Sequence, residues 1–189
     1  LDAARFGNLT ADYYYAYVPL QFVVGLLVDR YGPRRLLILA CLTCAMGAYL
    51  FAASDLLWVA QAGRFFIGFG SAFAFVCALK LATIWLPANR FAFVSGFITA
   101  LGMVGAIAGD MTLTKMVVVY GWRETMVIAA ILGVVLTLVI LLFLKKKRTT
   151  GQAAIEDEHS LHDLLQGLGR ALMKKQMWII GGIGTFLYL

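Results

Sequence analysis

Charged residues are scarce in this chain of 189 residues: Asp, Glu, Lys and Arg make up 14% of it, whereas 62% of the residues are hydrophobic. A soluble domain of this length needs more charge to cover its surface. The mean hydropathy of +0.86 therefore excludes an ordinary soluble protein and indicates a membrane protein. The net charge of +6 comes from basic residues that cluster beside apolar runs, as membrane topology signals do, so we expect no nucleic-acid partner.

Residues for metal, cofactor or covalent chemistry are also few. Cys41, Cys44 and Cys77 lie inside apolar runs, where they act as small hydrophobic residues and predict no disulfide. His159 and His162 lack cysteine or carboxylate partners in a defined geometry, so no metal site is predicted. Neither a phosphate-binding loop nor a nucleophile motif is present, so we expect no cofactor, no ATP-driven pump and no enzyme.

Five apolar stretches have the length that crosses a bilayer, which takes roughly 20 helical residues. They predict an all-α integral membrane protein, a multi-helix transmembrane bundle. The expected helices cover about 6–28, 36–53, 56–86, 91–120 and 125–144. A further apolar run at 177–189 is too short to cross and is interpreted as the start of another transmembrane helix. This run breaks off before it crosses, and the basic residues beside the spans place Leu1 on the outer side, so that a preceding span is expected. We therefore expect a fragment of a longer protein.

Basic residues beside the spans predict their orientation, since Lys and Arg are retained on the cytoplasmic side. They mark three loops, at 29–35, 87–90 and 145–176, as cytoplasmic. The turns at 54–55 and 121–124 then lie outside, and so does Leu1. We expect a multi-pass protein of a bacterial inner (plasma) membrane, in contact with the lipid bilayer.

The only polar stretch runs from 149 to 176, between the fifth span and the last apolar run. Ser160 and Asp163 form a helix-capping pattern, and the leucines from 161 to 172 recur at helical spacing. This predicts a cytoplasmic central loop with an amphipathic helix on the membrane surface.

A loop motif lies between the first two spans, where residues 25–35 read G-x-x-x-D-R-x-G-x-R-R. It resembles the signature loop of the major facilitator superfamily. Two further matches follow in the family's order: Arg64-x-x-x-Gly68-x-Gly70 resembles a fourth-helix motif, and the glycine ladder 102–109 with Gly-Trp-Arg at 121–123 is similar to the fifth helix and the loop behind it. The ladder departs from the antiporter version, which has Pro where Asp110 stands. The spans would correspond to family helices two to six.

The resemblance implies part of a fold in which two six-helix halves rock about a substrate site near the membrane midplane. It also implies that the loop motif latches the cytoplasmic side and governs alternating access. The implied gating residues are Gly25, Asp29, Arg30, Gly32, Arg34 and Arg35.

Charged side chains within the spans are the candidates for substrate binding or ion coupling, because burying them in a membrane costs several kcal/mol. Arg64 and Asp110 have similar expected depths and would pair or share a proton-linked network. Lys80 would point inward or extend its amine to the membrane surface. Tyr13, Tyr17 and Gln21 share a helical face that would be either a polar stripe toward the cavity or an aromatic belt with packing contacts.

Two buried cations without adjacent carboxylates suit an anionic substrate. The sequence thus predicts a secondary active transporter of a small solute, an organic anion or similar polar metabolite, by symport with a coupling ion, proton or sodium. The alternative is a transporter-like membrane receptor or scaffold without turnover.

Overall fold

In a computed structural model, the described residues are 3–53, 55–144, 173 and 179. The chain divides into two units, Leu1–Lys147 and Arg148–Leu189. The first contains five long helices, and all regular secondary structure in the described residues is helical. The expected amphipathic helix, the two histidines and nearly all of the final apolar run lie outside the described residues.

The five helices are α1 (Ala3–Tyr31), α2 (Pro33–Ala53), α3 (Leu57–Trp85), α4 (Phe91–Tyr120) and α5 (Trp122–Phe143), with a short 3₁₀ turn, η1 (Ala88–Arg90), before α4. Helices α2 to α5 are long and apolar enough to cross a membrane. α1 has the length but is more polar, because Asp12, Asn8 and several tyrosines interrupt its apolar face. The fold class predicted from the sequence is confirmed.

Backbone chemistry explains where the helices end. Gly32 and Gly121 adopt positive φ angles of 80° and 88°, which L side chains rarely adopt, and each forms the one-residue break between two helices. Pro33 opens α2, where its missing N–H is no loss. Leu86, which precedes Pro87, is extended at φ −118° and ψ 147°, so α3 stops there.

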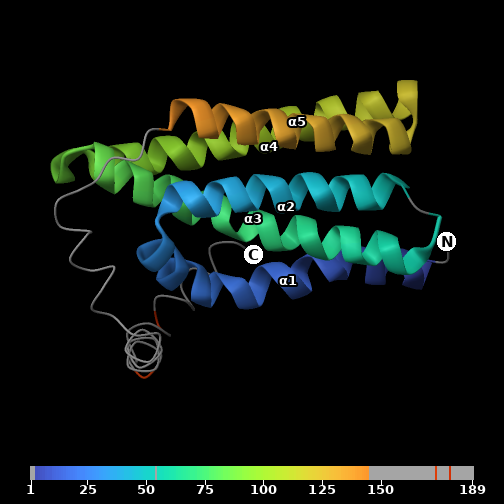
Figure 1. Cartoon of the computed structure of the whole chain (residues 1–189), viewed down its shortest axis with the longest axis horizontal. Helices are drawn as coiled ribbons and strands as arrows, with labels where there is room; N and C mark the ends of the chain where they lie inside the picture. The colour runs from blue at the N-terminus through green and yellow to red at the C-terminus, as the bar shows by residue number, and fades with distance from the viewer. Residues whose placement is uncertain (1–2, 54, 145–172, 174–178, 180–189) are drawn as a thin grey trace. The chain divides into compact units, whose positions relative to one another are not determined.

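Successive helices run in opposite directions, so the junctions at 32 and 86–90 and the end of α5 lie at one end of the helices. We call this the Asp29 end, and the opposite end, with the turn before α3 and the α4–α5 junction, the Asp55 end. The most extensive contacts join α2 with α3, α1 with α3, and α2 with α5 (Figure 1). α4 contributes no buried residue.

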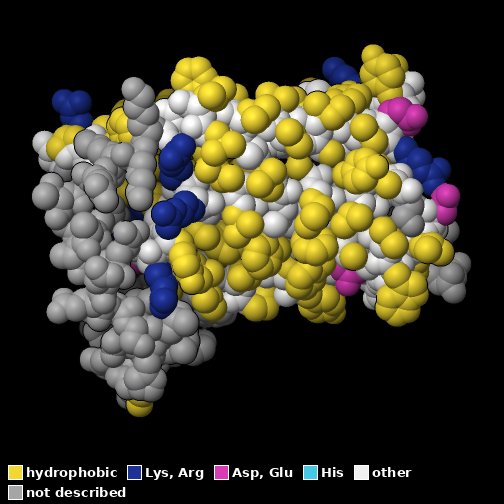
Figure 2. Space-filling model, viewed as in Figure 1, with side chains coloured by type: hydrophobic (Ala, Val, Ile, Leu, Met, Phe, Trp, Pro, Cys, Tyr) yellow, Lys and Arg dark blue, Asp and Glu magenta, His cyan; other side chains and the backbone are white. Residues whose placement is uncertain are grey.

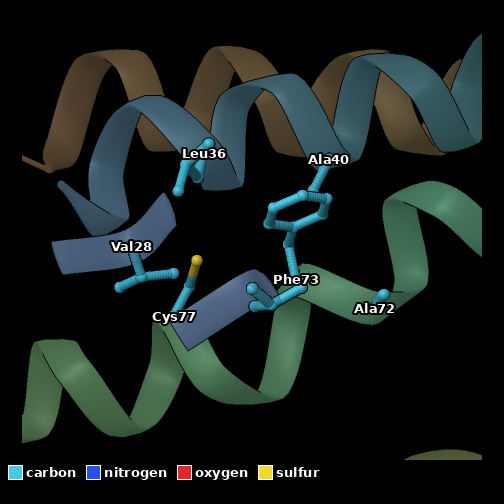
Figure 3. Packing of buried hydrophobic residues seen from close by; sticks show 7 residues of the cluster. Val28, Leu36, Ala40, Ala72, Phe73 and Cys77 are labelled. Carbon is cyan, nitrogen blue, oxygen red and sulfur yellow. The ribbon is translucent and has the colours of Figure 1, made fainter. Parts of the chain in front are cut away.

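The core lies where α1, α2 and α3 meet, toward the Asp29 end. Side chains from all three helices converge there, as Figure 3 shows for Val28, Leu36, Ala40, Ala72, Phe73 and Cys77. Phe73 and Cys77 are at most 1% exposed. Since Cys77 fills space among apolar side chains, its expected role as a small hydrophobic residue agrees with its surroundings.

Glycines bring these helices together. A methyl group added to Gly47 would lie 2.6 Å from the carbonyl oxygen of Gly63, and one added to Gly63 would lie 2.7 Å from that of Gly47. A methyl group at Gly68 would collide with the backbone of Tyr13. Small residues permit such approach in membranes, where packing rather than hydrophobic burial holds helices together. By contrast, Gly102, Gly105 and Gly109 on α4 have nothing within 4 Å of an added methyl group.

Candidate functional site at the Asp29 end

The loop motif forms the junction of α1 and α2. The N–H of Gly32 donates to the carbonyl of Val28 over 3.0 Å, and the N–H of Leu36 donates to the carbonyl of Gly32 over 3.4 Å. The chain thus reverses within one residue, which requires the positive φ angle of Gly32.

Asp29 forms an ion pair with Lys80 of α3, and the Lys80 Nζ lies 2.7 Å from the Asp29 Oδ1. Asp29 lies in the last turn of α1 and Lys80 six positions before the C-cap of α3. Their side chains are 55% and 33% exposed, respectively. The structure therefore gives Lys80 a carboxylate partner, and gives Asp29 the donor that a carboxylate at a helix end requires.

The ion pair borders a cavity of about 260 Å³ between α1, α3 and the start of α4. Apolar side chains form most of its wall, and Gly25 lies at its edge with nothing within 4 Å of an added methyl group. In the described residues Gly25 therefore makes no close helix contact. It leaves room beside the Asp29 carboxylate instead.

The three arginines of the loop motif have different surroundings. Arg34 donates from Nη2 to the carbonyl of Leu141 over 3.0 Å, which ties the start of α2 to the last turn of α5. Cations are favourable at helix C-termini, where carbonyl groups are left without partners. The Arg30 guanidinium lies 5.6 Å from the ring centre of Tyr31, and Arg35 is exposed.

Arg64 lies in the Asp55 half of α3. Its guanidinium lies 5.0 Å from the ring centre of Phe51 on α2, and its buried Nε has no hydrogen-bond partner. Asp110 on α4 is exposed, and these two described residues form no ion pair. The expected direct pairing of Arg64 with Asp110 is therefore absent from this structure, because α3 and α4 share few contacts and Arg64 turns toward α2.

The face of α1 expected to be either a polar stripe or an aromatic belt with packing contacts divides into two parts. Tyr13 and Tyr17 stack with their ring centres 5.6 Å apart, and Tyr17 packs against the core. The Tyr13 side chain also interacts with that of Ser71 on α3. Gln21 is exposed. The two tyrosines thus contribute to the α1–α3 contact.

Two charged side chains inside the spans expected from the sequence, Asp12 and Lys115, are not among the candidate residues. Asp12 on α1 has one buried carboxylate oxygen without a hydrogen-bond partner, and Lys115 is exposed near the Asp55 end of α4. A count of every charge inside the expected spans would find both.

Four helices apolar enough to cross a membrane, packed with α1 and carrying a charged, glycine-broken loop at one end, define a multi-pass membrane protein. The chain belongs to the Major Facilitator Superfamily, whose model matches residues 1–189. No solved structure matches the chain.

Three curated relatives of the chain are named as transporters. It is 26% identical to the probable sulfoacetate transporter SauU of Cupriavidus necator, covering 95% of this chain and 44% of that protein. It is 26% identical to the sialic acid transporter NanX of Escherichia coli over 71% of this chain and 32% of that protein. The probable L-galactonate transporter of Escherichia coli is also 26% identical, over 84% of this chain and 35% of that protein. The chain thus spans less than half the length of these relatives.

Proposed function

We propose that the full-length protein is a secondary active transporter of a small organic anion, coupled to an ion by symport and working by alternating access. The family assignment supports a transporter rather than an enzyme. Sulfoacetate, sialic acid and L-galactonate, the solutes in the names of the three relatives, are all acids. This supports an organic anion as the class of substrate.

The proposal rests on the surroundings of the Arg64 guanidinium. This group lies within a helix that is apolar enough to cross a membrane, against an aromatic ring, and without an ion pair to any described residue. A guanidinium presents its donors in a planar fork that matches a carboxylate or sulfonate. We assign Arg64 to the recognition of the anionic group.

The Asp29 end is the proposed gate. The Asp29–Lys80 pair joins α1 to α3, and Arg34 joins α2 to α5, so the loop motif connects four of the five helices. We therefore assign Lys80 to positioning Asp29 within the gate. Asp110, Gln21 and the tyrosines remain candidates for ion coupling or for the wall of the substrate cavity.

The test of Arg64 is uptake by the full-length protein in proteoliposomes, with labelled sulfoacetate as the anion and labelled glucose as a neutral probe. Loss of one charge-assisted contact in a partly dry site costs about 1.5 to 3 kcal/mol, so Arg64→Gln should lower kcat/KM for the anion roughly tenfold to a hundredfold. Arg64→Lys should retain part of the wild-type kcat/KM for the anion.

Arg123→Gln is the matched control, because Arg123 is an arginine on α5 that already has an acidic partner. It should leave anion uptake near the wild-type value. Sulfoacetate uptake by Arg64→Gln equal to that of the wild type, or an equal loss in Arg123→Gln, would contradict the role of Arg64 in anion recognition.

A further inference from the structure

A groove runs between α2 and α5 on their Asp55 half. Its volume is about 500 Å³. The lining side chains are apolar apart from one tyrosine hydroxyl, and they are Leu42, Ala45, Met46 and Tyr49 from α2 and Val127, Ala130, Ile131, Val134 and Val135 from α5. No residue of the proposed gate or of the candidate substrate site takes part.

The groove opens on the side of α2 that faces away from the bundle. Cys44 and Gly47 contact α3, whereas Leu42, Met46 and Tyr49 lie on the other side of the same helix and are 45%, 45% and 57% exposed. Figure 2 shows hydrophobic side chains over the middle of the described helices on the viewed face and Lys and Arg toward the ends of these helices, as expected of a surface in contact with a bilayer.

Close packing produces the floor of the groove. A methyl group added to Gly133 would lie 2.9 Å from the Cβ of Ala45, so α2 and α5 nearly touch there. Small buried side chains, Ala45 and Ala130, leave the space above this contact open. From Val127 to Val135 the groove extends about 12 Å along α5, from the helical rise per residue. One leaflet contributes about 15 Å of hydrocarbon, half of a core about 30 Å thick, so the groove has the length of a single acyl chain.

A charged pair stands at the mouth of the groove. Arg123 precedes Val127 by one turn and therefore shares its face of α5. Its guanidinium lies 4.7 Å from the ring centre of Trp122 and pairs with Asp55, while the two charged side chains remain 46% and 89% exposed. The mouth thus presents one cation and one anion beside a tryptophan, a residue enriched where membranes meet water.

We propose that this groove binds one phosphatidylethanolamine molecule. One acyl chain lies between α2 and α5, the phosphate contacts Arg123, and the primary ammonium donates to the carboxylate of Asp55. The negative phosphate and the positive ammonium of the headgroup are thus complementary to the charges of Arg123 and Asp55. A quaternary ammonium has no N–H to donate, so phosphatidylcholine makes the Asp55 contact less well.

The test measures lipid retained by the full-length protein. The protein is reconstituted in nanodiscs of equal phosphatidylethanolamine and phosphatidylcholine, transferred to a mild detergent, and analysed by native mass spectrometry. The wild type should retain one phosphatidylethanolamine in preference to phosphatidylcholine by roughly fivefold, the factor expected of one exposed charge contact. Val134→Trp should fill the groove and remove most of the retained lipid, whereas Leu142→Trp, an exposed position of α5 outside the groove, should not.

Two substitutions at the mouth test the headgroup without altering the groove. Asp55→Asn should abolish the preference for phosphatidylethanolamine, and Arg123→Gln should lower retention of both lipids. Lys115→Gln, which removes a cation near the same end of α4, should change neither. Retention by Val134→Trp equal to wild type, an unchanged preference in Asp55→Asn, or a wild-type protein that pairs with a second copy instead of lipid would overturn the proposal.

Discussion

The ion pair between Asp29 and Lys80 leads to a quantitative prediction for transport. Its charged atoms are 2.7 Å apart, and its side chains are 55% and 33% exposed. Two unit charges about 4 Å apart interact by about 1 kcal/mol in water and about 4 kcal/mol near a protein surface. Exposure and side-chain entropy reduce this, so we expect up to about 1 kcal/mol for the pair.

Such a free energy changes an equilibrium constant by up to about fivefold. If the pair positions Asp29 in the gate, Asp29→Asn and Lys80→Gln should each lower the initial uptake rate by about that factor. The two effects should not add, because each substitution removes the same contact. The initial uptake rate of the double variant should therefore be no lower than that of the slower single variant.

The assay is initial uptake by the full-length protein in proteoliposomes, normalised to the amount of inserted protein. Asp55→Asn and Arg123→Gln form the control cycle, because they break the ion pair at the other end of the helices. They should change uptake by less than about twofold, as for exposed ion pairs. If uptake by the double variant falls by the product of the two single factors, Asp29→Asn and Lys80→Gln act independently. That result would refute the coupling of the two residues.

Three more predictions concern packing and topology. Gly68→Ala should lower the thermal stability of the detergent-solubilised protein by about 1 to 3 kcal/mol, because its methyl group collides with the backbone of α1; an unchanged melting temperature would contradict the contact. Arg34→Gln should destabilise the protein by about 1 to 2 kcal/mol because it removes the donor to the carbonyl of Leu141 on α5, whereas Arg35→Gln, at an exposed position, should not. Equal melting curves for the two variants would exclude the role of Arg34 in joining α2 to α5. In a cysteine-free variant, Arg90→Cys should be shielded from an impermeant thiol reagent in intact cells while Asp55→Cys is labelled, and the reverse pattern would invert the predicted orientation.

Helix positions could be read closely from this sequence. The bounds expected for the fourth span, 91–120, agree with α4 at both ends, because Pro87 and Gly121 interrupt the backbone beside an otherwise apolar run. The first span was placed at 6–28, whereas α1 extends over Ala3–Tyr31. Polar residues near its start weaken the hydropathy signal but not the helix.

Contacts between helices could not be read in the same way. The pairing of Asp29 with Lys80 depends on the register of α1 against α3, which is set by the approach of Gly68 to Tyr13. Residues 51 positions apart in the sequence carry no local signal of such a register. The expected pairing of Arg64 with Asp110 rested on similar depth alone, and depth does not determine which way a side chain points around its helix.

Whether the full-length protein moves an organic anion is tested by uptake of a panel of labelled organic anions, sugars and cations into proteoliposomes, with and without an imposed proton or sodium gradient. We expect gradient-driven accumulation of one or more organic anions and of no neutral sugar. Folded protein that accumulates no solute under any gradient would contradict it and favour a receptor or scaffold without turnover.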